Sequence, residues 1–274
     1  MPELPEVETV RRGLAARLTG RRIAGVTVRR ADLRRPLPPD LAEALSGRAI
    51  RGFGRRGKYL LVHLDADATL IVHLGMSGRL AIADAPSGSA HEHVVFRFDD
   101  GTVLSYVDHR RFGLMDLAHA GRIEEHALLR HMGPEPLAAA FDGPALARRL
   151  AGKDTPIKAA LLDQRVVAGL GNIYVCEALF HADLSPRRRA GSVQRVRAAR
   201  LARAIQEVLE AAIAAGGSSL RDYVQASGEL GYFQHRFAVY DRAGLPCPGC
   251  DCAAGVRRIV QGGRSTFYCA RRQR

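Results

Sequence analysis

MPELPEVETVRRG (residues 1–13) places a proline at position 2 and two carboxylates, Glu3 and Glu6, at the start of a predicted helix. Apolar residues follow at spacings of three and four, as they do along one face of a helix, at Val7, Val10, Leu14 and Leu18. Pro5 suits the first turn of that helix, and acidic residues stabilise its positive end. The stretch therefore predicts a helix that presents chemically useful groups at its first turn.

Two changes of pattern divide the rest of the chain. Up to about residue 133, apolar and polar residues alternate as in β-strands, and Asp100-Gly101 within HVVFRFDDGTVLSYV (93–107) indicates a tight hairpin. The next segment is Ala-rich with helical periodicity, and the last one holds a short hairpin with Gly262-Gly263 at its turn. We therefore predict an α+β protein with an N-terminal β-sandwich flanked by helices (1–133), a helical domain (134–236) and a terminal cysteine-bearing β-hairpin (237–274).

The composition is that of a globular protein with a polyanionic partner. The 274 residues are 47% apolar and 25% charged, and 41 Lys plus Arg against 28 Asp plus Glu give a net charge of +13. This charge is spread along the chain and favours nucleic acid, although a generally basic surface would also produce it. No run approaches the ~18 apolar residues of a membrane span, and the N-terminus lacks the features of a secretion signal. We expect a soluble cytoplasmic protein with no membrane partner.

Pro2, Glu3 and Lys58 are the first candidates for catalysis. Removal of the initiator methionine would leave a secondary amine at Pro2, which can attack a sugar carbon and form an iminium link once its pKa is lowered. Lys58 can supply a nearby positive charge, and lysine is scarce in this chain, with only Lys58, Lys153 and Lys158. Glu3 would donate a proton as the adjacent general acid, assisted by Glu6. The alternative is that these are ordinary surface residues at a helix start and a strand end.

Two short motifs hold candidates for contacts inside a DNA duplex. HLGMSG (73–78) and DHRRFG (108–113) are predicted to lie on loops between strands. Apolar side chains and an arginine on such loops can enter a base stack and replace a lost pairing partner. Met76, Arg110 and Phe112 are these residues, although Met and Phe more often belong to a core.

A third motif, VVAGLGNIYVCEALF (166–180), predicts a helix that starts at an anion. Gly169 and Gly171 permit a tight turn, and Asn172 suits the N-cap of a helix beginning at Ile173. Backbone N–H groups and the Asn amide would then face an anion such as a DNA phosphate. A helix-turn-helix with an ordinary capped second helix would have the same pattern.

The terminal hairpin combines a basic tip with a candidate metal site. Arg264 directly follows the turn, from which a cation can reach a DNA groove. A four-cysteine zinc ribbon needs two pairs of thiolates, each usually spaced C-x2-C. Arg272 stands where the mate of the last cysteine should lie, so the candidate ligands are Cys247, Cys250, Cys269 and, in place of the missing one, Cys252. The pattern is compatible with a structural zinc ion and with a metal-free hairpin that holds free thiols.

These motifs, in this order, resemble the bacterial formamidopyrimidine-DNA glycosylase family over nearly the whole chain. The resemblance rests on PELPEVETVRRGL (2–14), GKYLL (57–61), HLGMSG (73–78), RRFG (110–113), GLGNIY (169–174) and QGGRSTFYC (261–269). It implies a base excision repair enzyme with a helix-flanked β-sandwich, a helix-two-turn-helix domain and a zinc finger. Such an enzyme removes 8-oxoguanine and formamidopyrimidines from double-stranded DNA and nicks the strand by β,δ-elimination. We expect a monomer associated with the bacterial nucleoid.

The resemblance also implies roles for individual residues. Pro2 corresponds to the nucleophile that forms a Schiff base at deoxyribose C1′, Glu3 to the general acid, and Lys58 to the phosphate-bound lysine of the catalytic site. Arg264 corresponds to a residue that assists δ-elimination. The implied DNA contacts are His73, His91, Lys153, Lys158, Asn172 and Arg264, together with Met76, Arg110 and Phe112 in the space of the flipped base. Arg110 would face the orphaned cytosine, and residues 218–232 correspond to the base-recognition loop.

The cysteines depart from the pattern of the family, which is C-x2-C-x16-C-x2-C. Cys252 and Cys269 keep the 16-residue gap, whereas Gly249 and Arg272 stand at the first and last ligand positions. Two alternative functions are a glycosylase related to endonuclease VIII, which acts on oxidised pyrimidines, and a DNA-binding protein without catalysis. The opening PELPEVETV, together with Met76, Arg110 and Phe112, favours the purine-directed enzyme. The presence of all three catalytic candidates favours catalysis.

Overall fold

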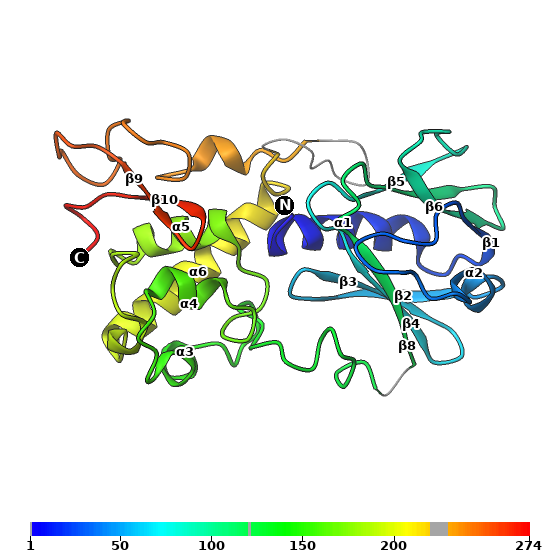
Figure 1. Cartoon of the computed structure of the whole chain (residues 1–274), viewed down its shortest axis with the longest axis horizontal. Helices are drawn as coiled ribbons and strands as arrows, with labels where there is room; N and C mark the ends of the chain where they lie inside the picture. The colour runs from blue at the N-terminus through cyan, green and yellow to red at the C-terminus, as the bar shows by residue number, and fades with distance from the viewer. Residues whose placement is uncertain (1, 120–121, 220–229) are drawn as a thin grey trace. The chain divides into compact units, whose positions relative to one another are not determined.

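The structure is a computed structural model that describes residues 2–119, 122–219 and 230–274 (Figure 1). The chain divides into two compact units, one formed by residues 1–130 and 215–232 and the other by residues 131–214 and 233–274. Within the described ranges, no helix is long and apolar enough to cross a membrane.

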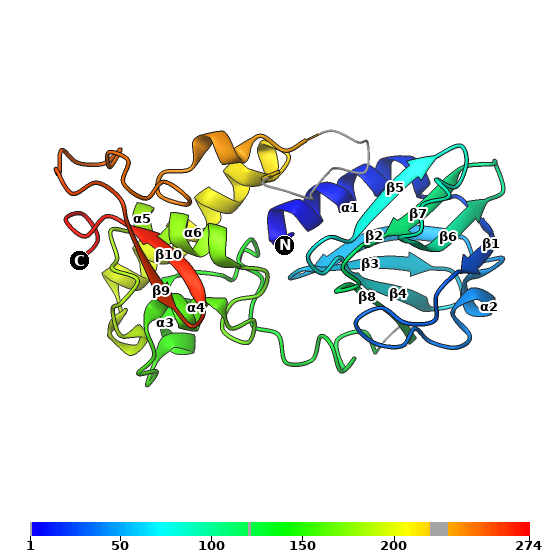
Figure 2. The ribbon, with the colours of Figure 1, turned by 45° about the horizontal axis from the view of Figure 1, so that its top comes forward.

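The first unit contains two four-stranded antiparallel sheets and the N-terminal helix (Figure 2). The strands follow the order β1-β6-β7-β5 in one sheet and β2-β3-β4-β8 in the other. The elements are α1 (Leu4–Leu18), β1 (Ile23–Val28), α2 (Leu41–Leu45), β2 (Ile50–Arg56), β3 (Tyr59–Leu64), β4 (Ala68–His73), β5 (Arg79–Ala83), β6 (Glu92–Phe98), β7 (Val103–Val107) and β8 (Leu114–His119).

The predicted first helix is confirmed as α1, with Glu3 as its N-cap and a proline in its first turn. Its apolar stripe is fully buried and joins a core formed by both sheets, with Val62 and Val72 from one sheet and Phe96 and Leu104 from the other. Burying each such side chain contributes about 1.5–3 kcal/mol. This packing is what holds the N-terminal end of the chain against the sandwich.

The hairpin predicted at Asp100-Gly101 joins β6 to β7. Gly101 has a φ of +88°, in the left-handed region that glycine tolerates. The Asp100 carboxylate accepts hydrogen bonds from the N–H and hydroxyl of Thr102, at 3.1 and 3.0 Å. The turn is therefore specified by two adjacent residues.

The second unit is helical and ends in a two-stranded hairpin. Its elements are α3 (Gly143–Leu150), α4 (Ile157–Leu162), α5 (Asn172–His181), η1 (Ala190–Ser192), α6 (Val196–Ala214), η2 (Phe233–Arg236), β9 (Arg257–Gln261) and β10 (Arg264–Tyr268). Helix α6 packs against α3 and α5, and β10 packs against α5. The predicted α+β class, with a β-sandwich before a helical region and a terminal hairpin, is confirmed.

Candidate active site and nucleic-acid contacts

The first turn of α1 is held by the carboxylate of Glu6. Its Oε2 accepts a hydrogen bond from the Glu3 N–H at 2.8 Å, and its Oε1 accepts one from the Ser218 N–H at 2.8 Å. Glu3 and Glu6 are 3% and 2% exposed, and Pro2 is also buried. Because two backbone donors bind one buried carboxylate, the chain end beside Pro2 has a defined position.

Lys58 lies in the two-residue turn between β2 and β3. Gly57 precedes it with a φ of +55°, a conformation that this tight turn requires and that favours glycine. The Lys58 side chain is only 7% exposed. A buried lysine is uncommon unless its charge has a function or a partner.

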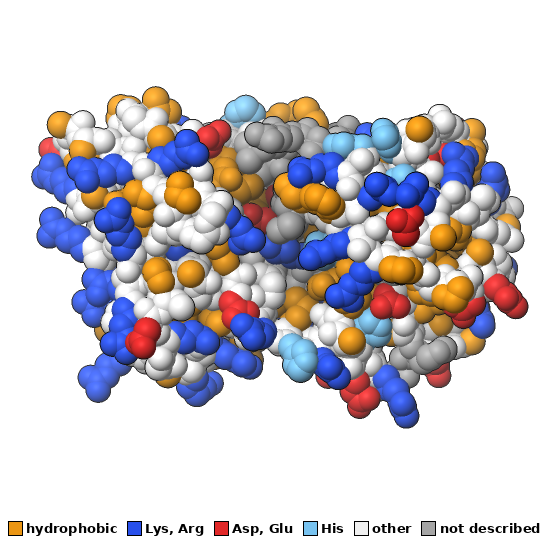
Figure 3. All heavy atoms as spheres, in the orientation of Figure 1, with side chains coloured by type: hydrophobic (Ala, Val, Ile, Leu, Met, Phe, Trp, Pro, Cys, Tyr) orange, Lys and Arg blue, Asp and Glu red, His pale blue; other side chains and the backbone are white. Residues whose placement is uncertain are grey.

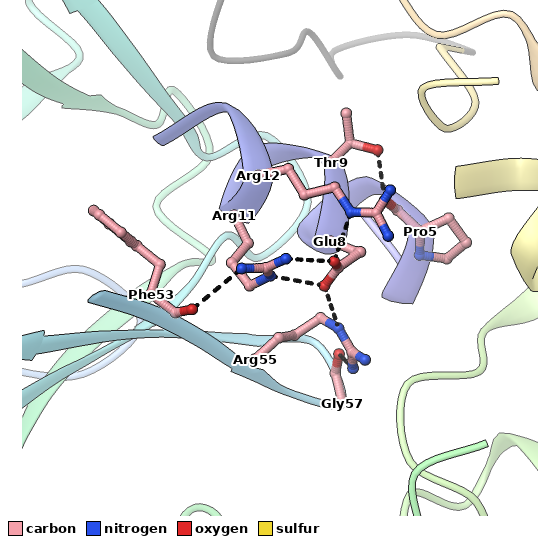
Figure 4. Close-up of polar contacts among 8 residues, drawn as sticks. All are labelled: Pro5, Glu8, Thr9, Arg11, Arg12, Phe53, Arg55 and Gly57. Atoms are coloured by element: carbon pink, nitrogen blue, oxygen red, sulfur yellow. Dashed lines mark hydrogen bonds and ion pairs between the residues drawn. The ribbon is translucent and has the colours of Figure 1, made fainter. Parts of the chain in front are cut away.

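A carboxylate on α1, that of Glu8, ties the helix to this turn (Figure 4). Arg11 binds it with two hydrogen bonds, at 2.8 and 3.0 Å, and Arg12 adds one at 2.8 Å. Arg55, near the end of β2, donates to the same carboxylate at 3.2 Å and to the Gly57 carbonyl at 3.0 Å. The network therefore connects the helix that carries Glu3 to the turn that carries Lys58.

The charge of Glu8 is stabilised by its arginines. Burial acts to raise the pKa of Glu8, but the hydrogen bonds from Arg11 and Arg12 and the charges of Arg11 and Arg55 lower it to about 2. Since an ordinary glutamate has a pKa of 4.5, the folded state favours the ionised form. This stabilisation is complete above pH 4.5 and is lost as the pH falls toward 2.

We therefore expect Glu8→Gln to lower the free energy of unfolding by about 3 kcal/mol at pH 7, the order of magnitude that such a pKa difference implies. The deficit relative to wild type should shrink steadily below pH 4.5. Urea unfolding between pH 3 and pH 7 measures both effects. The matched control is Glu43→Gln, which removes an exposed carboxylate on α2 and should change little. A deficit independent of pH would assign the loss to packing instead of charge.

His73, at the end of β4, is held as a neutral donor. Burial, followed by the charges of Lys58 and Arg34, lowers the pKa of His73 to about 4. Its Nδ1 accepts a hydrogen bond from the Gly75 N–H at 2.9 Å. In the neutral ring the proton therefore resides on Nε2, which can donate to an anion such as a phosphate oxygen.

Met76, Arg110 and Phe112 lie on two adjacent loops of the first unit. Residues 74–78 connect β4 to β5, and residues 108–113 connect β7 to β8. The Arg110 guanidinium stacks on the Phe112 ring at 4.9 Å, and Phe112 is 44% exposed. Met76 is half-buried. An exposed aromatic ring under an arginine matches the loop placement expected for groups that enter a base stack.

The structure corrects the helix start predicted in the second unit. Asn172 is the first residue of α5 and Gly171 is its N-cap, so Asn172 does not cap a helix beginning at Ile173. Its Nδ2 instead donates to the Ser265 carbonyl at 2.9 Å. The reason is tertiary, because β10 packs on α5 and offers a carbonyl to the amide.

Lys158 lies in the interior of the second unit, whereas a direct DNA contact is expected at the surface. It is fully buried, and its Nζ donates to Thr266 Oγ1 at 2.7 Å and to the Ser265 carbonyl at 3.1 Å. Lys158 and Asn172 thus bind the same carbonyl of β10. Arg264, at the first position of that strand, is exposed directly after the Gly262-Gly263 turn.

The remaining predicted contacts lie at the surface. His91 is exposed, with its ring 6.2 Å from that of His109, and Lys153 is half-buried after α3. Figure 3 shows Lys and Arg side chains distributed over the surface of both units. The positive charge is therefore not confined to one terminal segment, as the sequence predicts.

Four cysteines form a candidate metal site in the terminal segment. The Sγ atoms of Cys247, Cys250, Cys252 and Cys269 all lie within 4.8 Å of one another. Two of these distances, Cys250 to Cys269 and Cys252 to Cys269, are 3.5 Å. Tetrahedral Zn–S bonds of about 2.3 Å would place the sulfurs about 3.8 Å apart, so the donor set fits zinc. Arg272 stands at the expected position of the fourth ligand, and Cys252 supplies the fourth thiol of the cluster instead.

Arg272 has a different partner. Its Nε bonds Asp183 Oδ1 at 2.5 Å, and its guanidinium stacks on the Phe180 ring at 4.6 Å. A Cβ added at Gly249 would lie 1.7 Å from Arg272 Nη1, so a larger residue there would require this side chain to move. The residues at the first and last positions of the family pattern thus pack together and join the chain end to α5.

Sequence reasoning missed three buried carboxylates that organise these sites. Besides Glu8, they are Glu177 on α5 and Asp108 after β7, both 0% exposed. Glu177 accepts hydrogen bonds from three consecutive N–H groups, at Ala238, Val239 and Tyr240, between 2.8 and 3.0 Å. A lone acidic residue in the apolar stretch NIYVCEALF was the available signal, since it needs buried donors.

Two family models match most of the chain. Residues 1–115 match the formamidopyrimidine-DNA glycosylase N-terminal domain, and residues 132–224 match the formamidopyrimidine-DNA glycosylase H2TH domain. The formamidopyrimidine-DNA glycosylases of Acidiphilium cryptum and Rhodospirillum centenum are each 57% identical to this chain, over 100% of both sequences.

Solved structures agree with these matches. The MutM (Fpg) protein of Thermus thermophilus has a TM-score of 0.86 and 42% identity, and covers 99% of this chain and 98% of its own. The Lactococcus lactis Fpg in complex with DNA containing an abasic site has a TM-score of 0.88 and 35% identity over 99% of both chains. The fold and the matched domains define a DNA glycosylase of base excision repair. The chain belongs to the formamidopyrimidine-DNA glycosylase family.

Proposed function

We propose that the chain excises 8-oxoguanine and formamidopyrimidines from double-stranded DNA through the amine of Pro2 and then nicks the strand by β,δ-elimination. The observation that carries the proposal is the burial of Glu3 and Lys58, in the same unit as Pro2, on two elements joined by the Glu8 network. A carboxyl and an amine buried on connected elements are typical of a site that transfers protons.

The proposed reaction starts at the amine nitrogen, which donates its lone pair to deoxyribose C1′. The bond between C1′ and the base breaks, and the base leaves with that electron pair and a proton supplied by Glu3. The nitrogen then gives its proton to O4′ as the C1′–O4′ bond breaks, so that O4′ becomes a hydroxyl and C1′ is left as an iminium. Loss of a C2′ proton expels the 3′ phosphate, and loss of a C4′ proton expels the 5′ phosphate, with Arg264 supplying a cation for that last step.

The surroundings of Pro2 suit this role. The amine must be neutral to attack, and burial disfavours its charged form. The positive charge of Lys58 would act in the same direction and would also bind the phosphate next to the lesion. His73, neutral with its proton on Nε2, would donate to a second phosphate.

The remaining DNA contacts fall into direct and supporting groups. We propose that His91, Lys153, Asn172 and Arg264 bind the phosphate backbone, and that Met76, Arg110 and Phe112 occupy the space of the extruded base. Lys158 would act by holding the hairpin that presents Arg264, since its ammonium is buried against Ser265 and Thr266. The protein would act as a monomer on the DNA of the bacterial nucleoid in the cytoplasm. Residues 220–229, the centre of the predicted base-recognition loop, lie outside the described residues.

We further propose that Cys247, Cys250, Cys252 and Cys269 hold one zinc ion. The closeness of their four Sγ atoms supports this. Zinc would supply a structural cross-link for the terminal segment and no chemistry in the reaction. Its role would be to keep the β9–β10 hairpin in place.

The test is borohydride trapping on a duplex with one 8-oxoguanine opposite cytosine. Wild type should give a covalent adduct, and Pro2→Gly should lose about 100-fold in trapping rate because glycine does not hold the amine in place. Pro86→Gly, in the segment between β5 and β6, is a matched control that should trap normally. DNA binding without an adduct in wild type would overturn the proposal. Faster excision from a parallel duplex with 5-hydroxycytosine would assign the chain to pyrimidine lesions instead.

A further inference from the structure

The loops that carry Met76 and Phe112 meet at the backbone. Gly75 has a φ of +64°, and a Cβ added there would lie 2.3 Å from the carbonyl carbon of Phe112. A Cβ added at Gly113 would lie 1.7 Å from the hydroxyl of Tyr106. The two loops therefore approach each other as closely as glycine permits.

One buried carboxylate, that of Asp108, joins these loops. Its Oδ1 accepts hydrogen bonds from Ser77 Oγ at 2.5 Å and from the Arg110 N–H at 3.3 Å. Its Oδ2 accepts from the Gly113 N–H at 2.9 Å and from the Tyr106 hydroxyl at 3.2 Å. Ser77 belongs to one loop, and Arg110 and Gly113, on either side of Phe112, belong to the other, whereas Tyr106 lies on β7.

Asp108 is held by these neutral donors. It is 0% exposed and forms no ion pair within the described part of the chain. Burial, followed by the charge of Asp108 and the hydrogen bond to it, raises the pKa of Tyr106, so the phenol stays protonated as a donor. The carbonyl of Asp108 also accepts from His93 Nε2 at 2.8 Å, which fixes its backbone to β6. A buried charge satisfied in this way holds its donors in one arrangement.

We propose that Asp108 is a positioning residue that holds Met76, Arg110 and Phe112 as one rigid group, and thereby sets how well the enzyme extrudes the lesion and distinguishes the base opposite it. This inference rests on the proposed function of those three residues. Asp108 does not contact the reacting atoms in this assignment. Its effect is on the step in which the loops replace the extruded base. Side chains that are held loosely would have to become ordered as they enter the base stack, and that ordering costs free energy.

Asp108→Asn tests this with nearly the same shape. Asparagine offers one acceptor oxygen, and its NH₂ group would face donors that now bind Oδ1 or Oδ2. In either orientation the NH₂ group faces a backbone N–H, that of Arg110 or that of Gly113, so the 108–113 loop must lose one of its two hydrogen bonds to this side chain. We expect Asp108→Asn to slow single-turnover release of 8-oxoguanine opposite cytosine about 10-fold to 100-fold, the range that loss of one hydrogen bond to a charged group implies. The preference for cytosine over adenine in the opposite strand should fall as well.

The discriminating readout is a single-stranded oligonucleotide with a preformed abasic site. It has no opposite base and no stack to fill, so its cleavage through the Pro2 amine should stay within about twofold of wild type. A 2-aminopurine beside the lesion adds a spectroscopic signal, because its fluorescence rises when the stack opens. In a Glu3→Gln background, where base release is blocked, Asp108→Asn should reduce that rise.

Two further variants test whether the loss comes from the hydrogen bonds of Asp108 and not from a general disturbance of the fold. Ser77→Ala removes one donor to Asp108 and one acceptor of the Arg110 N–H but leaves the buried charge in place, so it should show the same pattern with a smaller loss. Asp100→Asn is the matched control, since Asp100 also binds backbone and hydroxyl donors in a turn of the same unit. Equal losses on duplex and single strand, or an unchanged opposite-base preference, would overturn the role of Asp108. A wild-type protein that forms no adduct on either DNA would instead defeat the proposed function.

Discussion

Glu3→Gln is expected to slow release of 8-oxoguanine about 10²–10⁴-fold in single-turnover assays, the range by which a positioned general acid accelerates a reaction. The amide keeps the size of the side chain and the backbone hydrogen bond from Glu3 to Glu6. It cannot give a proton to the departing base. The change therefore separates proton donation from the structure of the helix start.

A preformed abasic site provides the internal control for this variant. No base has to leave such a site, so Glu3→Gln should still form a borohydride-trapped adduct there at a rate close to that of wild type. Glu43→Gln, an exposed carboxylate on α2, should behave as wild type on both DNAs. If Glu3→Gln released the base within tenfold of the wild-type rate, Glu3 would not be the acid.

Cys269→Ser is expected to remove the zinc ion that we propose and to unfold the terminal hairpin. Structural zinc sites contribute about 10–16 kcal/mol to the folding of small metal-binding segments, more than the other contacts of such a short hairpin supply. Burial acts to raise the pKa of the Cys269 thiol, but the Arg272 N–H and the neighbouring thiols lower it to about 7. Zinc per chain, measured by mass spectrometry, should fall from one to near zero. Trypsin should then cut within residues 240–274.

The fifth cysteine gives a matched control for that experiment. Cys176 is 1% exposed and packs in the same apolar cluster, but it is not one of the four clustered thiols. Cys176→Ala should therefore keep the zinc and the protease resistance. Affinity for DNA should fall at least about tenfold in Cys269→Ser alone, because the phosphate contact that we propose for Arg264 depends on the hairpin. A wild-type protein without zinc, and with a protease-resistant hairpin in Cys269→Ser, would contradict the metal site.

The cysteines show where prediction from the sequence stopped. The spacing of the four residues indicated a shortage of one ligand, because Arg272 stands at the expected position. The structure brings Cys252 to the cluster and turns Arg272 toward Asp183 and Phe180. Neither Asp183 nor Phe180 is near Arg272 in sequence, so no spacing rule could have paired them.

Asn172 shows the same limit at a helix start. The motif GLGN correctly indicated a turn followed by a helix, because glycine and asparagine favour that local backbone. It misplaced the first helical residue by one, since Gly171 is the N-cap, and the asparagine amide binds a carbonyl of β10. That carbonyl lies 93 residues away in the sequence, so the local motif gave no indication of this partner.

The sequence by itself determined α1, the hairpins at Gly101 and Gly262-Gly263, and the groups expected at the N-terminal site, since these depend on interactions between residues a few positions apart. Only the tertiary structure decided which carboxylates hold the parts together. The sequence does not identify the partners of Glu8, Asp108 and Glu177, most of which are backbone N–H groups or arginines. Every residue but proline carries a backbone N–H, and arginine is abundant here, so no pattern of letters identifies which of them a buried carboxylate will bind.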